Sequence, residues 1–191
     1  MKRRVKVCMV GEYGVGKTTL LYGFLNRDYT PQTTLGIDFF SRTFRVKHQN
    51  VHMNIWDTAG SERYKSMTHS YLRDSEIVVF VYDLTDASAM SHVDSWMRII
   101  ESHKPSVVTV VGNKTDLLKG SYQDVQRMLE PWKRQDWTFV TGTTSKYRPE
   151  EFQSLLKKSL EIIVKDSPEV DRIRTAIEAK AFRQPKQTCC S

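Results

Sequence analysis

The sequence predicts an α/β fold, a mainly parallel six-stranded sheet with helices on both faces. Short apolar runs alternate along the chain with longer stretches of helical periodicity. Two of these runs, residues 77–82 and 107–111, are continuously apolar and rich in β-branched residues, which is typical of central strands buried on both faces. The chain has 191 residues, of which 39% are hydrophobic, and this is enough for the core of one domain.

The first half of the chain supplies a strand, a helix and a hairpin. Residues 5–10 form an apolar run that ends at a glycine, and residues 18–26 are expected to be helical. Residues 39–46 and 52–56 are predicted to be two extended segments that pair as a hairpin, with a polar tip at residues 48–50.

The second half adds a sixth strand at residues 138–140 and two amphipathic helices. Apolar side chains recur every three to four residues at Met90, Val93, Met97 and Ile100, and again from Phe152 to Ile163. Residues 121–135 are expected to be helical except at Pro131, which kinks or divides the helix. We therefore expect one domain over residues 1–166, followed by a polar tail over residues 167–191 that carries only positive charge from residue 179 onward.

Charge and cysteine usage exclude several functional classes. The net charge is +7, but lysine and arginine are scattered and do not alternate with aromatics, so no nucleic-acid partner is expected. The longest apolar run is far below the ~18–20 residues of a membrane span, and Lys6 interrupts the run that a secretory signal would need. Cys8 lies in an apolar segment, while Cys189 and Cys190 are adjacent, so a disulfide framework is not expected and a reducing compartment fits.

The first chemical motif is a phosphate-binding loop. Residues 11–18 match the pattern G-x-x-x-x-G-K-T between a predicted strand and a predicted helix. Such a loop points backbone N–H groups at phosphates, its lysine reaches the β- and γ-phosphates, and its threonine hydroxyl can bind Mg²⁺. The expected nucleotide-binding residues of this segment are Tyr13, Gly14, Val15, Gly16, Lys17, Thr18 and Thr19.

Two further motifs follow predicted strands. Asp57 begins the sequence D-T-A-G, where the carboxylate can hold Mg²⁺ and the N–H of Gly60 can meet a γ-phosphate. Asn113, Lys114 and Asp116 form N-K-x-D directly after residues 107–111. The Asp116 carboxylate can accept hydrogen bonds from N1–H and the exocyclic amine of guanine, whereas adenine offers neither donor, and the Lys114 stem can lie on the base plane. Together the motifs predict guanine nucleotides.

In order and spacing, these motifs resemble the Ras superfamily of small GTPases over about residues 4–165. Within it, further segments resemble the Rab family; these are residues 35–39, 53–56, 63–68, 70–75 and 81–85. Residues 36–43 and 70–75 resemble the Golgi-trafficking branch of that family. The resemblance implies a GTP/GDP switch that acts on membrane traffic. It also implies a monomer that works with effectors, an exchange factor, a GTPase-activating protein, a GDP-dissociation inhibitor and an escort protein.

The resemblance also assigns roles to residues that would otherwise pass as loop positions. Thr34 would bind Mg²⁺ and sense the γ-phosphate, and Tyr29 would place an aromatic ring against guanine. Thr144, Ser145 and Lys146 would contact the base oxygen. The implied catalytic set is Lys17, Thr34 and Gly60, and the implied metal set is Thr18, Thr34 and Asp57. Cys189 and Cys190 would carry geranylgeranyl groups that attach the protein to the cytosolic face of intracellular membranes, such as those of the Golgi or endosomes, from which it cycles with the cytosol.

The sequence departs from this family at three places around the phosphates. Ser61 stands where the family has a water-orienting glutamine, Tyr13 replaces a smaller side chain in the phosphate loop, and residues 29–34 are about two residues shorter than usual. These departures favour slow GTP hydrolysis.

A nucleotide-locked binding module that barely hydrolyses GTP is the alternative function. A P-loop nucleoside or adenylate kinase is disfavoured by Asn113 and Asp116 and by the terminal cysteines.

Overall fold

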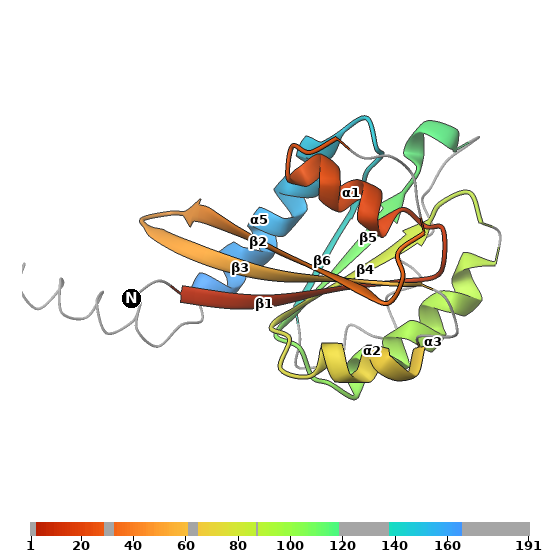
Figure 1. Ribbon diagram of the computed structural model, residues 1–191, viewed down its shortest axis with the longest axis horizontal. Coiled ribbons are helices and arrows are strands. Elements are labelled where there is room, and N and C mark those ends of the chain that lie inside the picture. The colour runs from red at the N-terminus through yellow and green to blue at the C-terminus, as the bar shows by residue number, and fades with distance from the viewer. Residues whose placement is uncertain (1–2, 29–32, 61–64, 87, 119–137, 166–191) are drawn as a thin grey trace, which may run out of the picture.

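The computed structural model describes residues 3–28, 33–60, 65–86, 88–118 and 138–165 of the chain (Figure 1). Within these residues the strands are β1 (Arg3–Val10), β2 (Ile37–Val46), β3 (Gln49–Thr58), β4 (Ile77–Asp83), β5 (Val107–Asn113) and β6 (Thr138–Thr143). The helices are α1 (Lys17–Phe24), α2 (Lys65–Leu72), α3 (Ala89–Glu101), the short 3₁₀ helix η2 (Thr115–Leu117) and α5 (Pro149–Lys165). The α/β class is as predicted.

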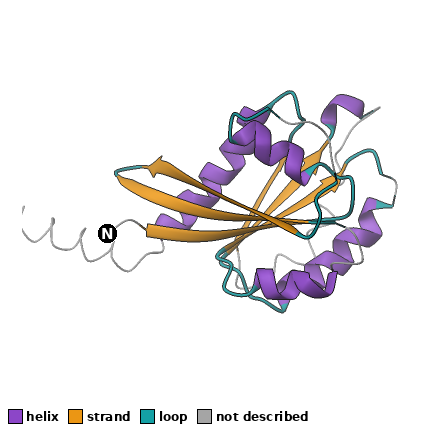
Figure 2. Ribbon diagram, viewed as in Figure 1, coloured by secondary structure: helices purple, strands orange, loops and turns teal. Residues whose placement is uncertain are grey.

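In the described part of the chain the strands form one six-stranded sheet in the order β2-β3-β1-β4-β5-β6 (Figure 2). All neighbouring pairs are parallel except β2 and β3, which pair antiparallel as the predicted hairpin. Strand β1 has β3 on one side and β4 on the other. The chain thus leaves β1 at the point where the strand order reverses, which is where open α/β sheets bind ligands.

The hairpin differs from the prediction in its turn and its length. Val46 pairs with Gln49, so the turn consists of Lys47 and His48 and not of residues 48–50. Lys47 takes the positive φ of 52° that a two-residue turn requires. Polar side chains at Gln49 and Asn50 suggested a turn, but a strand near the sheet edge accommodates polar residues on its solvent face.

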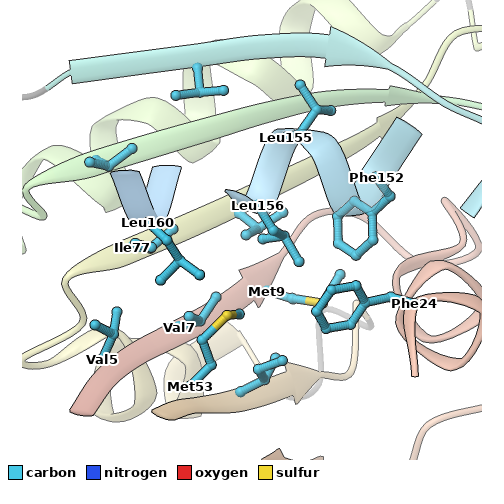
Figure 3. Close-up of a cluster of buried hydrophobic side chains, with 14 of the residues drawn as sticks. Val5, Val7, Met9, Phe24, Met53, Ile77, Phe152, Leu155, Leu156 and Leu160 are labelled. Atoms are coloured by element: carbon cyan, nitrogen blue, oxygen red, sulfur yellow. The ribbon is translucent and has the colours of Figure 1, made fainter. Parts of the chain in front are cut away.

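Helices cover both faces of the sheet, with α1 and α5 on one side and α2 and α3 on the other (Figure 1). Figure 3 shows the first core, where Phe24 of α1 and Leu156 of α5 meet the buried side chains of Val7 and Met9 from β1. In the second core, Trp96 of α3 packs with Phe80 of β4. Strands β4 and β5 contribute side chains to both cores, which explains their continuous apolar runs.

Helices α1, α3 and α5 lie close to their predicted positions, whereas α2 was not predicted from the sequence. α3 and α5 contain the two predicted amphipathic repeats, whereas α1 ends two residues before the expected boundary because Asn26 adopts the left-handed conformation, with φ 53°. The predicted helix over residues 121–135 and the tail lie outside the described residues. In the part of the chain that is described, no helix combines the length and the apolar character needed to cross a bilayer.

Candidate nucleotide-binding site

The phosphate loop joins the end of β1 to the start of α1. Gly11 and Gly16 adopt positive φ values of 143° and 96°. A Cβ atom on Gly11 would lie 2.0 Å from the Val81 carbonyl oxygen, and one on Gly16 would lie 2.4 Å from the Asn113 amide nitrogen. Side chains are therefore excluded at both positions by backbone conformation and by space, which accounts for the two fixed glycines of the motif.

Lys17 is buried at the first position of α1 and folds back over the loop. Its Nζ donates hydrogen bonds to the carbonyl oxygens of Gly11 and Glu12, each at 2.9 Å. Burial lowers the pKa of Lys17 to about 8, although the charges of Asp57 and Glu12 oppose this shift. A desolvated ammonium over the loop is the group that the sequence motif predicts to bind phosphate oxygens.

The predicted metal residues come together beside this lysine. The Thr18 hydroxyl donates to Asp57 Oδ2 at 2.6 Å and lies 2.7 Å from the Thr34 hydroxyl. Burial raises the pKa of Asp57 to about 6, and the hydrogen bond from Thr18 and the charge of Lys17 only partly offset it. The other oxygen of Asp57 is buried without a hydrogen-bond partner among the described residues.

This group of oxygens fits Mg²⁺. Mg²⁺ prefers hard oxygen ligands and is usually bound by one or two protein groups together with phosphates and water. The two threonine hydroxyls and the unpartnered Asp57 oxygen supply such a set, and a cation would offset the cost of burying the carboxylate. Bound there, the ion would neutralise charge on the β- and γ-phosphates.

Gly60 packs against the phosphate loop, which joins the second motif to the first. A Cβ atom on Gly60 would lie 2.4 Å from the Glu12 carbonyl oxygen and 2.6 Å from Lys17 Nζ. The segment is also tied to β2, because the Ala59 N–H donates to the Gly36 carbonyl oxygen at 2.9 Å. The close approach places the Gly60 backbone beside Glu12 and Lys17, where the motifs predict the γ-phosphate.

Tyr13 lines a cavity beside the phosphate loop. Its side chain is 63% exposed, and its hydroxyl is 3.1 Å from the hydroxyl of Thr33, immediately before Thr34. The cavity has a volume of about 350 Å³. Tyr13 lines it with Gly14, Gly16, Lys17, Thr18, Thr19, Thr33, Thr34, Thr58 and Gly60.

A second cavity, of about 280 Å³, adjoins the first and shares Gly14, Gly16 and Thr19 with it. Its remaining lining residues are Asn113, Lys114, Asp116, Leu117, Lys146 and Tyr147. Asn113 donates a hydrogen bond from Nδ2 to the Val15 carbonyl oxygen at 2.8 Å, which connects this base pocket to the phosphate loop. The two cavities together have room for a base at one end and phosphates at the other.

Backbone hydrogen bonds hold the loop after β6 beside the base pocket. Thr144 donates its N–H to the Gly112 carbonyl oxygen at 2.8 Å and accepts one from the Thr115 N–H at 3.3 Å. Thr144 and Ser145 are buried, whereas Lys146 is exposed at the pocket. All three therefore lie beside the N-K-x-D segment.

Most of the predicted site residues thus meet at one edge of the sheet, where strands β1, β3, β4, β5 and β6 end. Val15 contributes its carbonyl oxygen and is buried beneath the loop. Tyr29, Ser61, Cys189 and Cys190 lie outside the described residues, and their predicted roles remain predictions.

Two parts of the site were not predicted from the sequence. Trp96 Nε1 donates to the Glu12 carboxylate at 2.9 Å, so α3 supports the phosphate loop. Leu117 and Tyr147 form an exposed apolar rim of the base pocket, at 60% and 69% exposure. No local sequence pattern identifies these residues. A charged residue within a phosphate loop, such as Glu12, is nevertheless expected to have a hydrogen-bond partner.

The comparison with known families agrees with this geometry. A sequence model of the Ras family matches residues 6–160, which span the phosphate loop, D-T-A-G, N-K-x-D and the loop after β6. The match covers well over half of the chain. The members of the Ras family are small GTPases, which bind GTP and GDP and hydrolyse GTP. The chain belongs to the Ras family.

Proposed function

We propose that this small GTPase is a Rab-like switch that regulates intracellular membrane traffic. One observation supports this function best. The segments that resemble Rab proteins contribute a group of apolar side chains that are accessible to solvent and flank the γ-phosphate-sensing residues. Leu35 is 79% exposed and directly follows Thr34, and Phe39 on β2 is 56% exposed.

The aromatic part of this face is ordered by contacts within the hairpin. Phe39 pairs with Trp56 across β2 and β3, with ring centroids 4.9 Å apart and planes inclined at 66°. Strand β3 has β1 as its other neighbour, and Lys6 Nζ of β1 lies 5.0 Å from the centre of the Trp56 ring. Exposed aromatic and aliphatic side chains next to a ligand-sensing segment are suited to binding partner proteins. Nucleotide-dependent recruitment of effectors would use this face.

The tail gives the first prediction of this proposal, that Cys189 and Cys190 are geranylgeranylated. Each buried CH₂ contributes about 0.8 kcal/mol to membrane binding, and stable attachment takes two signals. Two prenyl chains together with Lys180, Arg183 and Lys186 meet that need. We expect intact mass spectrometry of protein from eukaryotic cells to show two added groups, and we expect Cys189→Ser with Cys190→Ser to move the protein from membranes to the soluble fraction.

Protein with Gln184→Ala is the matched control, because it alters the same tail but keeps both thiols and all three basic residues. It should carry both groups and remain on membranes. An unmodified C-terminal peptide together with a fully soluble wild-type pool would contradict the proposal of membrane attachment.

We also propose that hydrolysis is slow. Serine at position 61 has too short a side chain to orient a water molecule as glutamine does. The phenol of Tyr13 lines the phosphate cavity, so it narrows the approach to the γ-phosphate. Lys17 and the Gly60 N–H remain in place to stabilise charge on the phosphate oxygens, so hydrolysis is slowed without loss of binding.

The second prediction tests this rate by single-turnover hydrolysis. We expect wild-type protein to hydrolyse GTP more slowly than the ~10⁻⁴ s⁻¹ of Ras proteins that have the glutamine. Ser61→Gln should raise the rate because it restores an orienting amide, Tyr13→Ser should raise it by clearing the cavity, and the double variant should be fastest. GDP affinity is measured in parallel on the same variants.

If wild type and all variants hydrolyse GTP at the rate of a glutamine-bearing Rab, the proposal of slow hydrolysis is refuted.

The second candidate function is a GTP-locked module that recruits effectors. It is favoured by the contact of Tyr13 with Thr33, because this contact joins the phosphate loop to the residue beside Thr34. The nucleotide that co-purifies separates the two, since bound GTP after long purification indicates the locked module and GDP indicates a cycling enzyme.

A further inference from the structure

Asp83 is a largely buried carboxylate next to the base pocket. It lies in the Rab-like segment 81–85 but outside the phosphate loop, D-T-A-G and N-K-x-D, and no role was predicted for it from the sequence. It ends β4 and pairs in register with Asn113, the first residue of N-K-x-D on β5. Its side chain is 15% exposed, and Oδ2 lies 2.6 Å from Lys114 Nζ in an ion pair. Its other oxygen, Oδ1, accepts hydrogen bonds from the backbone N–H of Thr85 at 2.9 Å and from the Thr85 hydroxyl at 2.7 Å.

Both oxygens of this carboxylate are therefore fixed, one by its own turn and one by the lysine. The turn itself is anchored to the neighbouring strand, because the Leu84 N–H donates to the Asn113 carbonyl oxygen at 3.1 Å. Burial alone would raise the pKa of Asp83. The hydrogen bonds from Lys114 and Thr85 outweigh this effect and hold the pKa below its usual value, so the carboxylate is ionised at neutral pH.

Lys114 is constrained at both ends of its side chain. Its backbone is left-handed, with φ 66°, and its ammonium is held by Asp83. Between these points the stem lines the base pocket with Asp116 and Lys146. A long, flexible side chain that is already restrained in the free protein loses less conformational entropy when a base packs on it.

We propose that Asp83 is a positioning residue for guanine nucleotides, which holds Lys114 as a preformed wall of the base pocket. Asp83 does not touch the base in this arrangement and acts through Lys114. The inference uses only the guanine-nucleotide binding of the Ras family and is independent of the proposed role in membrane traffic.

The experiment measures dissociation of a fluorescent GDP analogue from the full-length protein with Mg²⁺. Asp83→Asn keeps the shape of the side chain and the bonds from Thr85 but removes the charge that holds Lys114. We expect dissociation about tenfold faster than in wild type, which corresponds to about 1.4 kcal/mol. Asp94→Asn is the matched control, because it removes an exposed ion pair with Arg98 on α3 and should leave the rate unchanged.

Two readouts separate positioning from a structural role. In a Lys114→Met background, Asp83→Asn should change the rate by less than about twofold, since the group that it positions is absent. Inosine diphosphate lacks the exocyclic amine that Asp116 binds, so the ratio of GDP to inosine diphosphate affinity reports on Asp116. That ratio should be the same in wild type and Asp83→Asn.

A tenfold effect that persists in the Lys114→Met background would overturn the proposal, as would an unchanged rate in Asp83→Asn. Thr85→Val, in an exposed turn, keeps the ion pair but removes one hydrogen bond to the carboxylate. It should quicken dissociation by about twofold. If Asp83→Asn does not fold and Thr85→Val releases GDP at the wild-type rate, the proposal is wrong. If wild-type protein binds adenine nucleotides as tightly as guanine nucleotides, the result would instead contradict the assignment of this protein as guanine-specific.

Discussion

Replacement of Asp116 by asparagine is expected to weaken GDP binding on the order of 100-fold and to create a preference for xanthine nucleotides. The carboxylate offers two acceptors to the two N–H groups on the edge of guanine. An asparagine amide offers one acceptor and one donor, so its NH₂ group faces the exocyclic amine. Xanthine carries a carbonyl oxygen at that position and restores the match. A hydrogen bond to a charged group contributes roughly 1.5–3 kcal/mol, and loss of one or both accounts for the expected decrease.

Competition against a fluorescent nucleotide measures the dissociation constants of GDP, xanthosine diphosphate and ADP. Asp86→Asn is a suitable control, since this carboxylate lies in the turn after β4 and accepts hydrogen bonds from the N–H and hydroxyl of Ser88, which asparagine can also do. Wild-type protein that binds ATP as tightly as GTP would show that Asp116 does not select the base.

The fold was predictable because its strongest signals are local. Strands β4 and β5 are buried on both faces, so residues 77–82 and 107–111 are apolar except at the buried Thr109. Helices α3 and α5 each place one apolar stripe on the sheet. Boundaries were less predictable at the hairpin and at the end of α1. There the conformation depends on the positive φ of single residues, Lys47 and Asn26, which a hydrophobic pattern does not report.

The motifs of the site were also predictable from the sequence, because they are local. The phosphate loop, D-T-A-G and N-K-x-D are short segments whose residue types follow from the chemistry of phosphate, Mg²⁺ and guanine. Their supports are not local. Glu12 and Trp96 are 84 positions apart in the chain, and the ion pair of Asp83 with Lys114 joins the ends of two strands. Such partners are identified only when the strand order brings them together.

The strand order also provides a path from the γ-phosphate to the proposed partner-binding face. Gly60 contacts the phosphate loop, and its neighbour Ala59 bonds to Gly36, between Thr34 and the start of β2. Leu35 and Phe39 lie on this same segment, so the exposed apolar face and the phosphate sensors share a backbone. A ligand that favours one position of Gly60 will therefore favour one position of this face.

For that reason Gly60→Ala is expected to slow GTP hydrolysis on the order of 100-fold while GDP affinity stays within a few-fold of wild type. The added Cβ would lie 2.4 Å from the Glu12 carbonyl oxygen and 2.6 Å from Lys17 Nζ, well inside contact distance. The D-T-A-G segment must then retreat from the loop by about 1 Å, and a misplacement of this size can cost about 100-fold in rate. GDP lacks the γ-phosphate that Gly60 meets, so its binding depends on the loop and the base pocket.

Single-turnover hydrolysis and GDP dissociation, measured on the same preparations, test this separation. The matched control is Gly23→Ala, a glycine within α1 whose added Cβ would lie 3.3 Å from the Pro149 side chain, away from the phosphates. Alanine favours the helix there, so both rates should equal those of wild type. Hydrolysis by Gly60→Ala at the wild-type rate would mean that the close packing of Gly60 on the phosphate loop does not position the γ-phosphate contact, and that Lys17 and Thr34 suffice to sense it.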